Sequence, residues 1–374
     1  MSVQKRHLTA VVILAVMVLA GTVASLEFLK MNRPDVIYPS AALTMTCMLS
    51  DYFPPLKGSD GDTRIYVYGG AAPGATVLLL GGTHPNEPAG FIAATVIVEN
   101  LAVRTGRVLV IPQACASGFR CTDPFEGYPQ FFEVSGKSGH RTFRMGSRVC
   151  SPLDQWPDPL VYTQYPSGQS LSGLESRNLN RSYPGRPDGT FTERVGFAIM
   201  ELLRKEKVDV AFDLHEAAPE IPIINAIVYH EKGEDIALTA VLDLESYNMR
   251  YSPELSPVNF RGLSHREWGD RTDVIPFLME VSNPIQGRIR GRTNTDLITK
   301  GVSERYLEAL QSGALRIEYE PSGEPLERRV GRHIEGFKAI LDAYNIFHAD
   351  RPIEMDGLPS YQDLIDHGLG HYLN

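Results

Sequence analysis

The stretch GGTHPNEPAG, residues 81–90, places His84 and Glu87 three residues apart among glycines and prolines. It follows the apolar run 77–80 and precedes a segment with helical character. Imidazole nitrogen and carboxylate oxygen are preferred ligands of zinc, and a catalytic zinc takes three protein ligands and keeps one position open. The H-x-x-E spacing therefore predicts two ligands of a catalytic metal, with a third supplied from elsewhere in the chain.

The third candidate ligand is His215, which follows the apolar run 208–214. Ligands gather at the carboxyl ends of strands in open α/β sheets, so this histidine and the H-x-x-E pair are expected to meet there. Asp213 is a candidate to support His215, although we expect strand alternation to point it to the other face. The alternative is that His84 and His215 are ordinary loop histidines. Their joint position at strand ends, with Glu87 at ligand spacing, favours the metal.

A metal hydrolase also needs a base, and the sequence VIPFLMEV buries Glu280 within an apolar run. An isolated buried charge is costly, so such a glutamate needs a partner or a chemical role. Burial raises the pKa of a carboxyl group towards the range useful for proton transfer. The alternative is an edge strand on which Glu280 faces solvent.

Two arginine-rich motifs lie between these residues. The motif RNLNRSYPG begins with Arg177 and contains Asn180 and Arg181, and the motif FRMGSR contains Arg144 and Arg148. A guanidinium group binds a carboxylate through two parallel hydrogen bonds, and a neighbouring amide adds a donor. Asn180 and Arg181 are therefore a candidate clamp for a substrate carboxylate.

In order, the motifs GGTHxNE, FRxGSR, NLNRSYPG and DLH, followed by a late apolar strand with a glutamate, resemble the zinc carboxypeptidase superfamily. The resemblance is closest to its succinylglutamate desuccinylase/aspartoacylase branch and runs from about residue 76 to about residue 290. It implies an α/β fold of the phosphorylase/hydrolase-like type, with a mixed central sheet sandwiched between helices. It also implies one zinc ion per chain.

The resemblance assigns the metal site and the base. His84, Glu87 and His215 would hold the zinc. Glu280 would activate the attacking water and later protonate the leaving amine. Pro85 stands where the branch usually has glycine, and a C-terminal β domain typical of the family is not evident.

The resemblance also assigns the arginines. Arg148 would polarise the scissile carbonyl and stabilise the oxyanion, whereas Asn180 and Arg181 would grip a substrate carboxylate. Because the insertion between Arg148 and Asn180 is long, Arg144 or Arg177 are alternatives for the role of Arg148.

The predicted function is zinc-dependent hydrolysis of an amide bond next to a free carboxylate, as in deacylation or desuccinylation of an N-acyl amino acid. One alternative is an exported metallocarboxypeptidase acting on peptides or cell-wall fragments. A second is a non-catalytic carboxylate-binding protein on the same fold. The expected partner is a small anionic amide or peptide. A net charge of −9 argues against nucleic acid, and oligomeric state is left open.

The N-terminus has the pattern of a targeting segment, and a buried helix of the fold is the alternative. Lys5 and Arg6 precede the uncharged, mostly apolar run 8–26, which is just long enough to span a bilayer. We expect residues 1–29 to be a membrane anchor or a cleaved signal peptide. Residues 30–374 would form one hydrolase domain outside the cytoplasm, periplasmic or at the cell surface.

Four cysteines, an even number, fit an oxidising compartment. They are Cys47, Cys115, Cys121 and Cys150. Cys115 and Cys121 flank a short loop and are one candidate pair. Three connectivities are open on the sequence.

Hydrophobic patterns predict an alternation of strands and helices. The predicted strands cover 64–68, 77–80, 108–111, 208–214, 223–229 and 275–281. The predicted helices cover 89–103, 191–205, 235–244, 303–310 and 331–344. Residues 112–190 lack clear periodicity and are expected to be a long functional loop.

Overall fold

The computed structural model describes residues 3–30, 34–122, 129–137 and 139–374. The chain divides into two compact units, Met1–Val36 and Ile37–Asn374. The first contains the helix α1 (Val3–Lys30), whose residues Gln4–Lys30 are long and apolar enough to cross a membrane. A signal sequence meets the same criterion, so anchor and cleaved signal both stay predictions, as does the division after residue 29.

The second unit is built on a nine-stranded mixed sheet. Its strand order is β1 (Met45–Met48), β2 (Arg64–Gly69), β4 (Ala102–Ile111), β3 (Ala72–Leu80), β9 (Val210–Ala217), β12 (Ile275–Ser282), β10 (Ala226–Tyr229) and β11 (Ser252–Leu255). The short β13 (Glu354–Asp356) adds to one end of β4.

The centre of this sheet is parallel, which brings the carboxyl ends of several strands to one edge. β3 and β12 both run parallel to β9. The register pairs Leu80 with Asp213, and His215 with Glu280. The predicted metal ligands therefore approach the same edge from β3 and β9, and Glu280 lies on the strand next to His215.

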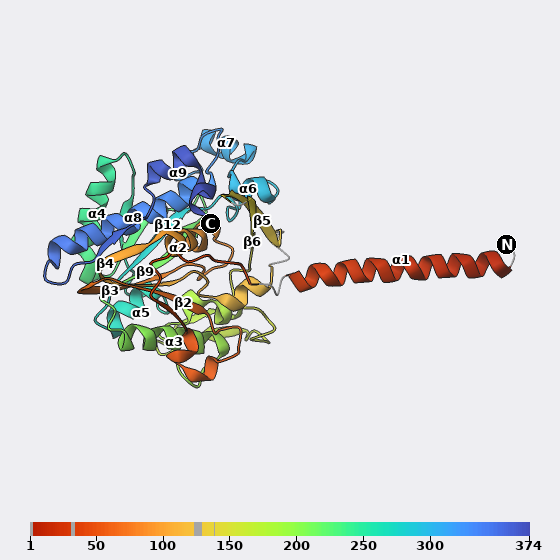
Figure 1. Cartoon of the computed structure of the whole chain (residues 1–374), viewed down its shortest axis with the longest axis horizontal. Helices are drawn as coiled ribbons and strands as arrows, with labels where there is room; N and C mark the ends of the chain where they lie inside the picture. Colours follow the sequence, from red (N-terminus) through yellow and green to blue (C-terminus); the bar gives the residue numbers. More distant parts are fainter. Residues whose placement is uncertain (1–2, 31–33, 123–128, 138) are drawn as a thin grey trace. The chain divides into compact units, whose positions relative to one another are not determined.

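Helices cover both faces of the sheet (Figure 1). One face packs against α2 (Pro88–Asn100), α4 (Glu234–Ser246) and α8 (Leu326–Phe347), and the other against α3 (Phe191–Lys205) and α5 (Ser264–Arg271). Short helices α6 (Thr295–Thr299), α7 (Glu304–Gln311) and α9 (Tyr361–His367) complete the C-terminal part. The predicted fold class, a mixed sheet between helices, is confirmed.

The predicted loop over residues 112–190 contains two small hairpins. β5 (Phe131–Gly136) pairs with β6 (Gly139–Arg144), and β7 (Val161–Thr163) pairs with β8 (Ser170–Ser172). Phe132 and Phe143 lie opposite each other in the first hairpin, with ring centroids 5.9 Å apart, and join the core that contains α2. The expectation of an irregular segment was therefore wrong here, because two buried aromatic rings anchor this short hairpin in the core.

Candidate metal centre

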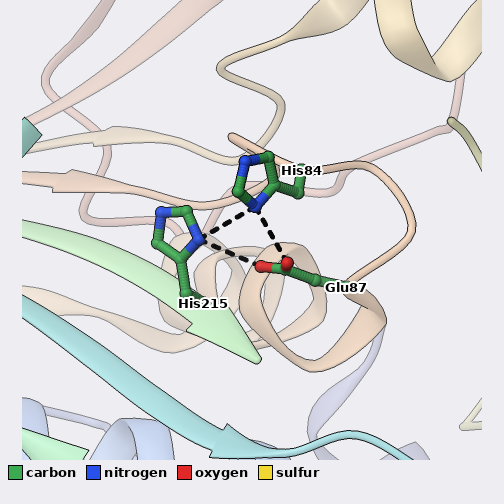
Figure 2. Close-up of side chains that lie close together, drawn as sticks. All are labelled: His84, Glu87 and His215. Atoms are coloured by element: carbon green, nitrogen blue, oxygen red, sulfur yellow. Dashed lines mark hydrogen bonds and ion pairs between the residues drawn. The ribbon is translucent and has the colours of Figure 1, made fainter. Parts of the chain in front are cut away.

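The three predicted ligands form one compact cluster (Figure 2). His84 Nδ1 lies 2.8 Å from Glu87 Oε1 and 3.1 Å from His215 Nδ1. His215 Nδ1 lies 3.0 Å from Glu87 Oε2, and none of the three residues is more than 2% exposed. Among the described residues, no other group of three or more His, Cys, Asp or Glu side chains brings its donor atoms this close.

Backbone geometry explains how the turn after β3 positions two candidate ligands. The chain leaves β3 through Gly82, whose φ of +64° is accessible to glycine at little cost. A Cβ at Gly82 would also lie 2.9 Å from the ring of Phe119. The turn then carries His84 and ends at Glu87, which is the N-cap of α2 and precedes Pro88 at the first helical position.

His215 lies within β9 rather than beyond its end. The predicted strand end at residue 214 was wrong, because pairing with β12 continues to the last pair, Ala217 with Ser282. Residues i and i+2 of a strand share a face, so Asp213 points to the same side as His215. The expectation that Asp213 faces away was also wrong: its Oδ2 lies 3.0 Å from His215 Nε2.

The outer nitrogen of each imidazole faces an oxygen acceptor. His84 Nε2 lies 2.9 Å from Asn178 Oδ1, and His215 Nε2 lies at ion-pair distance, 3.0 Å, from Asp213 Oδ2 without the geometry of a hydrogen bond. Acceptors at Nε2 favour the tautomer in which Nε2 carries the proton and Nδ1 offers its lone pair. Both Nδ1 lone pairs and the Glu87 carboxylate then point at one place, where they repel one another unless a cation lies between them.

The charge state of the two imidazoles supports the same conclusion. Burial and the nearby Arg148 lower the pKa of His84 to about 4. Burial also disfavours charge on His215, but the carboxylates of Asp213 and Glu87 outweigh it and raise its pKa to about 10. The two carboxylates thus favour a positive charge at this place, and a metal ion can supply it. Two nitrogens and one oxygen are a donor set that zinc accepts, so these residues fit the metal that the resemblance implies.

Several donors hold the Glu87 carboxylate. Arg148 Nη1 lies 2.9 Å and Gln286 Nε2 lies 3.0 Å from Oε1, and the N–H of Glu216 donates to Oε2 at 3.0 Å. The Arg148 side chain is partly exposed, with 38% of its surface accessible. The sequence analysis had not singled out Gln286, because a lone glutamine in a loop carries no motif.

Glu280 lies on an interior strand of the sheet. β12 is flanked by β9 and β10, so the edge-strand alternative does not hold. The residue is half-buried, but its Oε2 is enclosed and finds no hydrogen-bond partner among the described residues. Burial, and secondarily the charge of Glu87, raise the pKa of Glu280 to about 8 against the opposing effect of His215. This is the environment of a carboxyl group that can exchange a proton near neutral pH.

The candidate clamp lies in a one-turn 3-10 helix, Leu179–Arg181. The Asn180 side-chain oxygen accepts from the N–H of Ser264 at 2.8 Å, which leaves the amide NH₂ as the group that can donate to a substrate. The Arg181 guanidinium stacks over the ring of Phe260, 4.7 Å from its centroid. Burial and the proximity of Arg148 lower the pKa of Arg181 to about 10, against the opposing effect of nearby carboxylates. Its nearest carboxylate is Glu175, 3.7 Å from Nε.

The two alternative arginines have other environments. Arg177 donates to both carboxylate oxygens of Asp158 at 2.6 and 2.8 Å and to the carbonyl of Cys150 at 2.7 Å. Arg144 is buried, with its guanidinium 5.8 Å from the ring centroid of Phe119. Neither side chain shows the contact with Glu87 that Arg148 makes.

The chain has partial sequence similarity to one characterised enzyme. No family model matches the chain. N-alpha-acetyl-L-2,4-diaminobutyric acid deacetylase of Halomonas elongata is 25% identical over 159 residues, which cover 42% of this chain and 33% of the relative. The match thus spans a third of that protein's length. The predicted resemblance is confirmed.

Solved structures with partial similarity include three proteins. A succinylglutamate desuccinylase from Silicibacter is 19% identical, with a TM-score of 0.38, covering 66% of this chain and 64% of that one. The ectoine utilization protein EutE (DoeB) of Ruegeria pomeroyi is 21% identical, with a TM-score of 0.36, covering 59% and 54%. Csd4, a D,L-carboxypeptidase of Helicobacter pylori, is 14% identical, with a TM-score of 0.42, covering 78% and 56%. With identities of 14–21% and TM-scores of 0.36–0.42, these structures are similar to the chain only in part, and they do not establish its function.

Proposed function

We propose that this chain is a zinc-dependent hydrolase that cleaves an amide bond next to a free carboxylate. The observation that carries the proposal is the buried cluster of His84, Glu87 and His215, with Glu280 in register beside His215. Zinc held by these three side chains would supply a Lewis acid and lower the pKa of a water molecule.

The chain's own residues supply the remaining chemistry. Glu280 Oε2, enclosed and without a partner among the described residues, takes the proton of the attacking water and passes it to the leaving amine. Arg148 stabilises the negative charge that develops on the carbonyl oxygen, because its partly exposed side chain already contacts the Glu87 carboxylate. Arg181 and the NH₂ group of Asn180 bind the substrate carboxylate.

N-acyl amino acids are the favoured substrate class, because the curated relative is a deacetylase of an N-acetylated amino acid. The second candidate is an exported metallocarboxypeptidase that acts on peptides or cell-wall fragments. The apolar helix α1 favours it, since we propose that this helix directs the rest of the chain out of the cytoplasm. Both candidates use the same site. They differ in whether the cleaved amide joins an acyl group to an amino acid or joins two amino acids of a peptide.

Metal content tests the site directly. The full chain, purified in detergent and loaded with zinc, is expected to retain about one ion per chain. His84→Ala and His215→Ala are each expected to lose it. If the unmodified protein retains no zinc after reconstitution, the proposal of a zinc-dependent hydrolase is wrong.

Substrate assays then separate the roles of the other residues. Glu280→Gln is expected to keep the metal and to lose about 10²–10⁴-fold in rate on N-acyl amino acids. Arg181→Ala is expected to raise KM for substrates with a free carboxylate and to leave a matched carboxamide substrate unaffected. Equal loss on both substrates would contradict the clamp.

A further inference from the structure

Two of the four cysteines meet in the interior. Cys115 Sγ lies 3.3 Å from Cys150 Sγ, and each residue is 2% exposed. The other two have different contacts: Cys121 Sγ lies 3.8 Å from the carbonyl of Gly118, and Cys47 Sγ lies 3.8 Å from the hydroxyl of Tyr52. Of the pairings left open by the sequence, the fold brings Cys115 into contact with Cys150 rather than with the other candidate, Cys121.

Each partner cysteine is joined to a segment of the candidate metal centre. The N–H of Cys115 donates to the carbonyl of Gly82 at 3.0 Å, in the turn that leads to His84. Cys150 follows Arg148 by two residues. A bond between the two sulfurs would cross-link the histidine turn to the arginine segment.

The two segments already pack closely. The N–H of Gly146 donates to the carbonyl of Pro85 at 3.2 Å, and the N–H of Ser147 donates to the carbonyl of Gly118 at 3.0 Å. A Cβ on Gly146 would lie 2.3 Å from Pro85 Cβ, and one on Gly118 would lie 2.9 Å from Pro85 Cγ. The sulfurs thus lie between backbones that are already fixed, and closing a bond of about 2.05 Å requires side-chain rotation rather than loop movement.

We propose that Cys115 and Cys150 form a disulfide that ties the Arg148 segment to the turn carrying His84. Both thiols lose a proton and together two electrons, while the S–S bond of a disulfide oxidant is reduced to two thiols. The inference does not depend on the hydrolase activity, and it matches the oxidising compartment to which α1 would deliver the chain.

The thiol chemistry favours this exchange. The contact with Cys115 lowers the pKa of the Cys150 thiol, and the thiolate is the form that attacks a disulfide. Cys115, whose pKa the same contact raises, then closes the bond by attacking the mixed disulfide.

Peptide mapping tests the connectivity. The full chain in detergent is incubated with oxidised glutathione, alkylated without reduction and digested. One linked peptide joining Cys115 to Cys150 is expected, with Cys47 and Cys121 alkylated. Alkylation of both Cys115 and Cys150, or a link from Cys115 to Cys121, would overturn the proposal.

Stability and hydrogen exchange test the cross-link's effect. After chelation, so that bound metal does not contribute, the oxidised chain is expected to unfold about 5 °C above the reduced chain. Cys150→Ser should abolish the difference, whereas Cys121→Ser, the matched control, should keep it. The amides of Gly146 and Ser147 should exchange faster after reduction. Unchanged exchange at both amides would show that the bond does not hold the arginine segment.

Discussion

At the scale of single residues, two different groups orient the two histidines. Asp213 presents a carboxylate to His215, and Asn178 presents an amide oxygen to His84. Asn178 is in turn fixed by its NH₂ group, which donates to Glu175 at 2.7 Å. The amide oxygen of Asn178 accepts a hydrogen bond from the imidazole N–H without adding negative charge to the site. The His84 side of the cluster therefore depends on a single neutral contact.

Removing that contact should weaken metal binding. Asn178→Ala leaves His84 Nε2 without its acceptor, so we expect zinc affinity to fall about 10–100-fold, the usual effect of losing such an outer partner. Competition with a chromophoric chelator measures the affinity. Glu175→Gln, which keeps an oxygen acceptor behind Asn178, is the matched control and should bind zinc like the parent. An unchanged affinity in Asn178→Ala would show that the amide does not orient the ligand.

The residues found from sequence share a local signal. His84 and Glu87 are three positions apart, and His215 and Glu280 lie in apolar strands, so spacing and hydrophobicity reveal them. Gln286 reaches Glu87 from 199 positions away, from a loop without periodicity. Such long-range contacts depend on the order of the strands in the sheet, and hydrophobic periodicity does not reveal that order.

At the scale of elements, a buried ion pair connects α8 to the site. Glu216 Oε1 accepts from Arg329 Nη1 at 2.8 Å, and neither side chain is exposed to solvent. Glu216 Oε2 accepts from the N–H of Ala89 at 2.8 Å, in the first turn of α2. From the sequence, Glu216 is a carboxylate next to His215 without an assigned role, whereas in the structure it joins β9, α2 and α8 beside the candidate ligand Glu87.

Breaking this pair should be costly. Arg329→Met leaves the Glu216 charge buried without its partner, so we expect a loss of about 3–5 kcal/mol in the free energy of unfolding. Chemical denaturation of the full chain measures it. The double variant Glu216→Gln with Arg329→Met removes the charge but keeps an acceptor for Ala89, and it should recover much of that loss. A double variant no more stable than the single one would show that packing, not charge, holds the elements.

Element boundaries were predictable where the pattern is strong. The helix predicted over 191–205 has the same bounds as α3, whose start is fixed by a capping box between Thr190 and Glu193. The helix predicted over 89–103 ends three residues early, since residues 102 and 103 begin β4. There the pairing of β4 with β13 decides the boundary, and β13 lies some 250 positions further along the chain.

At the scale of the whole molecule, the N-terminal helix predicts a topology. Lys5 and Arg6 should stay in the cytoplasm, placing the rest of the chain across the membrane. Alkaline phosphatase fused after Asn374 should therefore be active in cells. The double substitution Leu14→Arg and Val16→Arg should abolish that activity, because each arginine costs about 2.5–3.5 kcal/mol in the centre of a spanning helix. Alkaline phosphatase activity that survives both substitutions would contradict export by α1. The intact mass of the exported chain then distinguishes a retained anchor from a cleaved signal.

Metal binding should also stabilise the whole molecule, because its ligands come from the turn after β3, the start of α2 and β9, which only the folded chain brings together. Zinc at 100 times its Kd should add about 2.7 kcal/mol to the free energy of unfolding. The unfolding temperature of the chelated full chain should therefore rise with zinc. His84→Ala should abolish the rise, whereas Glu280→Gln, outside the ligand set, should keep it. An equal rise in His84→Ala would place the metal elsewhere, and His367 and His371, with ring centroids 5.4 Å apart, would be the pair to replace next.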